Sequence, residues 1–139
     1  MFRSILAVVA GIVALTIVSF AIEAAVDPLL MHLFPAALPD AAALARTLSA
    51  RLLMLAYTTF SIAVGGYVTA FIARRSRLKH AAIMGAIEMA FTLYVMIAAP
   101  FPEAHSAPRW GGIVGMILMI PAACLGAAIQ AKQARKSAP

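Results

Sequence analysis

The chain has 139 residues, of which 64% are hydrophobic and 12% are charged. Soluble domains carry about a quarter charged residues, so the charges of this chain are too few to cover a surface that faces water. The apolar content excludes intrinsic disorder, and a single cysteine excludes a disulfide-stapled scaffold. These numbers predict an integral membrane protein with one domain, residues 1–139.

Four apolar stretches are long enough to cross a bilayer as helices, which takes roughly 20 residues. We predict an all-α, multi-pass membrane protein, a bundle of four transmembrane helices at about residues 4–26, 52–73, 81–99 and 110–131. The first stretch is longer than the apolar part of a signal peptide, and Glu23 lies just before the plausible cleavage position after Ala25. We therefore expect the first span to be retained.

The positive charges predict how the spans are oriented. Lys and Arg are enriched in the cytoplasmic loops of membrane proteins, so we expect both termini and the short middle loop to be cytoplasmic. The net charge of +6 therefore reports orientation rather than nucleic-acid binding. Three basic residues lie at the opposite ends, and eight lie at the predicted cytoplasmic ends: Arg3, Arg74, Arg75, Arg77, Lys79, Lys132, Arg135 and Lys136.

The predicted outer side holds two loops of different character. Asp40 follows Pro39 and is a suitable N-cap for a helix. An unbroken helix from there to Arg74 would be about 52 Å long, far more than the roughly 30 Å of a hydrocarbon core. We therefore expect a bend near residues 48–51, with a short amphipathic segment at about 40–48 on the outer membrane surface. The second loop, residues 100–109, contains three prolines and predicts an irregular cap.

Glu88 is the strongest candidate for a functional residue, because ionisable groups inside a membrane are costly and usually face a cavity. It shares a helix face with Thr92, and Ser61 in the preceding span offers a hydroxyl group as a hydrogen-bond partner. One interpretation is a proton or ion site formed by Glu88, Ser61 and Thr92. The other is structural, with a neutral Glu88 hydrogen-bonded to Ser61, Thr58 or a backbone carbonyl.

Glu23 belongs to a polar stripe on the first span, with Thr16, Ser19 and Asp27 at helical spacing. Arg51 enters the membrane from the same predicted outer side. We expect an outer-side ion pair between Glu23 and Arg51 that fixes the first hairpin. The alternative is that Glu23 marks the mouth of a polar pathway toward the carboxyl group in the third span.

Small residues at helical spacing predict close contacts between the spans. Several of them lie at about the depth of the carboxyl group in the third span, so they would surround it. The predicted helix-packing positions are Gly11, Gly65, Gly66, Gly85, Gly111 and Gly115.

The basic cluster in the middle loop has two interpretations. Contact with anionic lipid headgroups is one, and plain topogenic charge is the other. The cluster consists of Arg74, Arg75, Arg77 and Lys79. We expect no metal site or cofactor, because the histidines are scattered and the single Cys124 lies in an apolar helix.

Residues 65–75 read Gly-Gly-Tyr-Val-Thr-Ala-Phe-Ile-Ala-Arg-Arg, and His80 opens the next span. This stretch, together with a glutamate in the first span before a proline-rich loop, resembles a group of small bacterial four-span membrane proteins. The resemblance covers the middle third of the chain. It implies a bacterial cytoplasmic (inner) membrane protein and carries no known activity.

These observations favour a helix-packing or accessory component of the membrane, present as a homo-oligomer or as a subunit of a larger complex. The alternative is a small proton- or cation-coupled transporter or channel that uses Glu88. The expected partners are membrane lipids and other membrane proteins, with no nucleic acid. No sequence motif of an enzyme is present, so we expect no catalytic activity.

Overall fold

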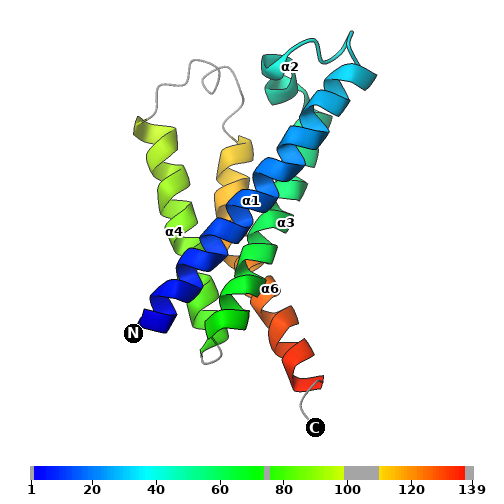
Figure 1. The fold of residues 1–139 in the computed structure, drawn as a ribbon. Helices are drawn as coiled ribbons and strands as arrows, with labels where there is room; N and C mark the ends of the chain where they lie inside the picture. The colour runs from blue at the N-terminus through cyan, green and yellow to red at the C-terminus, as the bar shows by residue number, and fades with distance from the viewer. Residues whose placement is uncertain (1, 74–75, 99–109, 137–139) are drawn as a thin grey trace.

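A computed structural model describes residues 2–73, 76–98 and 110–136 of the chain. Over these residues the fold is all-helical and has no strands (Figure 1). Four helices are long and apolar enough to cross a membrane, which confirms the predicted all-α bundle with four candidate spans. The helices in chain order are α1 (Phe2–Leu33), α2 (Ala41–Arg46), α3 (Leu48–Ala73), α4 (Arg77–Ala98) and α6 (Trp110–Lys136).

Helix α1 is longer than the predicted first span, because it continues through Pro28 to Leu33. A proline inside a helix removes one backbone hydrogen bond, so the continuation needs another source of stability. Leu30 and Met31 supply it by packing against a small buried cluster of Leu38, Leu44 and Ala50. This cluster fastens the end of α1 to α2 and to the first turn of α3.

The break between α2 and α3 is defined by local hydrogen bonds. The backbone N–H of Ala43 donates to the Asp40 carboxylate over 2.7 Å, so the predicted N-cap is confirmed. Thr47 is extended, and its N–H and hydroxyl groups both donate to the carbonyl of Ala43, over 2.9 Å and 2.8 Å. The chain therefore changes direction at Thr47, next to the predicted bend.

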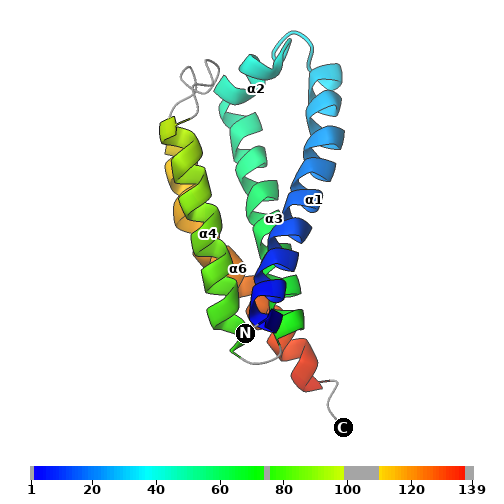
Figure 2. The same ribbon diagram turned by 60° about the vertical axis from the view of Figure 1, so that its left-hand side comes forward.

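Helix α3 is the centre of the bundle and contacts all four other helices. Both chain termini lie at one end of the bundle, and α2 lies at the other (Figure 1). We call these the terminal end and the α2 end. In both ribbon views α1 and α4 are close together at the terminal end and far apart at the α2 end (Figures 1 and 2). The ribbons of α1 and α4 therefore diverge from the terminal end toward the α2 end.

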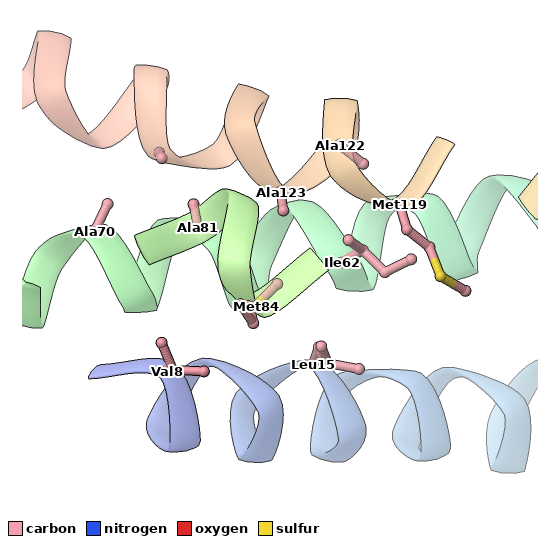
Figure 3. Packing of buried hydrophobic residues seen from close by; sticks show 10 residues of the cluster. Val8, Leu15, Ile62, Ala70, Ala81, Met84, Met119, Ala122 and Ala123 are labelled. Atoms are coloured by element: carbon pink, nitrogen blue, oxygen red, sulfur yellow. The ribbon is translucent and has the colours of Figure 1, made fainter. Parts of the chain in front are cut away.

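The buried core explains how closely the helices pack. It consists mainly of alanine with a few larger side chains, and Met84 is fully buried at its centre (Figure 3). Small side chains let helix backbones approach closely. The residues of this core are Val8, Leu15, Ile62, Ala70, Ala81, Met84, Met119, Ala122, Ala123 and Ala127.

Candidate functional site

A cavity of about 380 Å³ has α1 and α4 as two of its walls. Helices α3 and α6 contribute the remaining lining residues. Its volume falls within the range of about 300–1,000 Å³ that is usual for small-molecule sites. We call it the carboxyl cavity, and its lining residues are Leu15, Thr16, Ser19, Phe20, Glu23, Thr58, Ile62, Glu88, Phe91, Thr92 and Met119.

The two carboxyl groups that stood out in the sequence line this same cavity from opposite helices. Glu23 comes from α1 and Glu88 from α4. Glu23 accepts a hydrogen bond from the Ser19 hydroxyl over 3.4 Å. Glu88 is partly buried, and within the described part of the chain it makes no hydrogen bond or ion pair. Helical spacing explains the α1 side, because Thr16, Ser19 and Glu23 follow one face of the helix.

The other two predicted members of the Glu88 site are placed differently. Thr92 lines the carboxyl cavity beside Glu88, and its hydroxyl lies 4.0 Å from the sulfur of Met119. Ser61 is 1% exposed and donates to the carbonyl of Tyr57 in its own helix over 2.9 Å. The structure therefore brings Thr92 to the cavity and gives the Ser61 hydroxyl a backbone partner.

Sequence reasoning missed the aromatic part of the lining. Phe20 and Phe91 both line the cavity, although in sequence they resemble any lipid-facing phenylalanine. Each lies three residues from one of the two glutamates, Phe20 before Glu23 and Phe91 after Glu88. Residues three apart share a helix face, so this spacing was the signal available in the sequence.

A layer of tightly packed backbone lies between the carboxyl cavity and the terminal end. A Cβ atom added to Gly65 would lie 2.8 Å from the carbonyl oxygen of Gly11, and one added to Gly66 would collide with the backbone of Ala123. A Cβ on Gly85 would lie 3.1 Å from the Cα of Ile120. We call this layer the floor of the cavity. Side chains also contribute to it, since the Thr69 hydroxyl donates to the Met84 sulfur over 3.3 Å.

The other two glycines that we predicted to pack against neighbouring helices are Gly111 and Gly115. They lie near the α2 end and line a second cavity of about 340 Å³. It shares Thr58, Thr92 and Met119 with the carboxyl cavity, so the two spaces adjoin. A Cβ on Gly111 would lie 2.5 Å from an Nη atom of Arg51, whereas one on Gly115 would lie 3.6 Å from its nearest neighbour in Leu55. Gly111 is therefore close-packed and Gly115 is not.

Arg51 also lines this second cavity, with its guanidinium 4.7 Å from the centre of the Trp110 ring. This is a cation–π distance. The contact that the structure gives Glu23 is with Ser19 instead. The ion pair between Glu23 and Arg51 therefore stays a prediction.

Tyr57 is a buried polar residue near the outer part of the polar stripe on α1, which consists of Thr16, Ser19, Glu23 and Asp27. Its side chain is 7% exposed, and its hydroxyl has no hydrogen-bond partner within the described residues. One carboxyl oxygen of Asp27 is likewise buried without a partner in the described part of the chain.

Most of the basic residues that the structure describes lie at the terminal end, whereas Arg46 and Arg51 lie toward the α2 end. The Arg3 guanidinium donates to the carbonyl of Ile72 over 3.1 Å and so ties α1 to the last turn of α3. In the predicted lipid-contact cluster, Arg77 is partly buried and Lys79 is exposed. Arg74 and Arg75 lie outside the described residues.

No group of three or more His, Cys, Asp and Glu side chains in the described part of the chain is arranged to hold a metal ion. What the structure offers instead is a cavity with two carboxyl groups, several hydroxyls and two aromatic rings. Comparison of the chain with protein-family models, curated proteins and solved structures gives no match.

Proposed function

We propose that this protein is a small transporter or channel that binds a proton or cation at Glu88. The observation that carries the proposal is that Glu88 and Glu23 line one cavity from opposite helices. In a membrane each of these groups is costly to keep ionised. Two of them facing one space is the arrangement expected of a site that binds positive charge.

The surroundings of Glu88 favour this function over a structural clamp. A clamp requires a hydrogen bond from Glu88 to a neighbouring helix, and the described residues contain none. Four hydroxyl groups line the same cavity and can bind a cation or a water molecule: Thr16, Ser19, Thr58 and Thr92. Glu23 lies nearer the α2 end and would act as the outer mouth of the pathway.

The test is ion flux into liposomes that contain the purified protein, followed with a pH-sensitive dye and with sodium and potassium gradients. We expect Glu88→Gln to abolish the flux of the transported ion and Glu23→Gln to reduce it. Asp40→Asn is the matched control, because it also removes one negative charge but lies outside the cavity and retains a capping oxygen. Equal flux in the wild type and Glu88→Gln would overturn the proposal.

We further propose a multi-pass protein of a bacterial cytoplasmic membrane, with the terminal end facing the cytoplasm. The charge distribution supports this orientation, because six of the described Lys and Arg residues lie at the terminal end and two, Arg46 and Arg51, lie toward the α2 end. A groove of about 570 Å³ at this end is lined by Leu78, Lys132, Arg135 and Lys136, among others. Together with Arg77 and Lys79 in the first turn of α4 it would contact anionic lipid headgroups.

A second candidate function is a packing or accessory component that works as an oligomer. A separate groove of about 480 Å³ runs between α3 and α6, and small residues line much of it, including Ala56, Ala63, Ala122 and Gly126. Grooves of small residues are where membrane helices dock closely. The occupant proposed here is a helix of a second copy of the chain.

Mass measurement of the intact assembly after mild solubilisation separates the two functions. An oligomer through this groove predicts that Ala56→Leu yields monomers, whereas Ala90→Leu on the exposed surface of α4 does not. A wild-type monomer would contradict the oligomer. Stable co-purification with a larger protein would indicate an accessory subunit instead.

A further inference from the structure

We infer that the carboxyl cavity takes an amphipathic organic cation, an ammonium group with apolar substituents, rather than an inorganic ion alone. The inference rests on the proposed function, since it names the class of cation that the same site would bind. Three features of the cavity carry it: its size, its lining and the exposure of its aromatic rim.

The cavity is much larger than a bare ion needs. Its volume of about 380 Å³ is more than ten times the roughly 30 Å³ that a water molecule occupies in the liquid. An inorganic cation prefers a close cage of several oxygen ligands. Within the described residues no set of three acidic, histidine or cysteine side chains gathers around one point. An organic cation fills such a space without a cage.

The lining combines negative charge with aromatic and apolar surface. Phe91 shares a helix face with Glu88, and Phe20 shares one with Glu23, so each carboxyl group has an aromatic ring beside it. Aromatic faces attract ammonium groups through cation–π interactions. Apolar side chains complete the lining and would receive the substituents of the ligand: Leu15, Ile62 and Met119.

The aromatic rings of the lining are exposed where an amphipathic molecule would arrive. The ribbons of α1 and α4 diverge toward the α2 end (Figures 1 and 2), while the close backbone contacts of Gly65 and Gly66 lie on the terminal side of the cavity. Phe20 and Phe91 are 66% and 62% exposed. Their position in the lining and their exposure place them at the rim of the cavity. A cation with apolar substituents can reach this rim while part of it stays in the lipid.

Calorimetric titration of the detergent-solubilised full chain with benzyltrimethylammonium tests the inference. The neutral probe is neopentylbenzene, which has a carbon atom in place of the charged nitrogen. We expect benzyltrimethylammonium to bind and the neutral isostere to bind at least tenfold more weakly. Glu88→Gln should weaken binding of the cation by tenfold or more, and Phe91→Leu by about two- to fivefold.

Matched variants guard against effects on folding. Glu88→Asp keeps the charge and should retain most of the binding. Phe71→Leu changes an exposed phenylalanine of α3 that does not line the cavity, so it should have no effect. Glu88-dependent flux of protons or sodium without binding of benzyltrimethylammonium overturns this inference and leaves the proposed function standing. Equal binding of the two probes, unaffected by Glu88→Gln, overturns the inference as a nonspecific apolar site. Absence of both Glu88-dependent flux and Glu88-dependent binding overturns the inference and the proposed function together.

Discussion

Two tyrosines of α3 use their hydroxyl groups in opposite ways. Tyr67 donates to the side-chain carbonyl of Gln133 over 2.7 Å and so connects α3 with α6. Tyr57 is buried, and its hydroxyl has no partner among the described residues. A hydrogen bond contributes about 0.5–1.5 kcal/mol, whereas a buried polar group without a partner costs free energy.

The same substitution therefore has opposite effects at the two positions. Tyr67→Phe should lower the free energy of unfolding by about 0.5–1.5 kcal/mol. Tyr57→Phe should leave it unchanged or raise it by up to about 1 kcal/mol. Thermal unfolding in detergent, followed by circular dichroism, measures both. A clear loss of stability in Tyr57→Phe would show that its hydroxyl has a partner after all.

Gly66 makes the closest backbone approach in the floor of the cavity, since an added Cβ would collide with the Ala123 backbone. Gly66→Ala should force α3 and α6 apart and lower the free energy of unfolding by about 1–3 kcal/mol. Gly115→Ala is the control, because its Cβ would lie 3.6 Å from Leu55, in ordinary contact. In that variant the better helix propensity of alanine should dominate and stabilise by up to about 1 kcal/mol. Equal unfolding temperatures for the two variants would contradict the close packing at Gly66.

At the scale of one element, α2 depends on its cap. Six residues are too few for a helix to be stable alone, so the Asp40 carboxylate and the buried Leu44 hold it in place. Asp40→Ala should destabilise α2 by about 0.5–2 kcal/mol. Hydrogen exchange of the α2 amides should become faster, while Asp40→Asn should preserve their protection. Unchanged exchange in Asp40→Ala would mean that packing alone holds α2.

Local signals predicted most of the elements. Each candidate span is long and apolar by itself, and the Asp40 cap is visible in the residues that surround it. The end of α1 was not predictable in this way. Its last turns depend on Leu30 and Met31 meeting a cluster built by α2 and α3, and such contacts between distant segments leave no local pattern.

For the candidate site too, local features were predictable from the sequence and contacts between distant segments were not. Glu23 and Glu88 were recognisable one at a time, because a carboxyl group in an apolar stretch is unusual wherever it occurs. That both line one cavity depends on how α1 and α4 are rotated toward each other. Phe20 and Phe91 were missed for the same reason, since their sequence neighbourhood does not distinguish the rim of a cavity from a lipid-facing surface.

At the scale of the whole molecule, the start of α1, the end of α6 and most of the described basic residues share one end, which gives a direct test of the proposed orientation. Asp40→Cys at the α2 end should react with a membrane-impermeant maleimide added to bacterial spheroplasts. Lys136→Cys at the terminal end should react only after the membrane is permeabilised. The wild type, with Cys124 partly buried in α6, is the background control. The reverse labelling pattern would overturn the orientation, and labelling of both variants in sealed cells would indicate insertion in two directions.

Helix α1 is much longer than the membrane that it would cross. Its apolar stretch covers 31 residues, Arg3–Leu33, and at about 1.5 Å per residue this is about 46 Å, compared with roughly 30 Å of hydrocarbon. Such a helix tilts, protrudes or locally thickens the bilayer, and α1 crosses the other helices diagonally (Figure 1). Because α1 is also one wall of the carboxyl cavity, a change in its tilt would change how far Glu23 stands from Glu88. In a membrane, the acyl-chain length of the surrounding lipids would then help to set the width of the cavity, a form of control that needs no regulatory ligand.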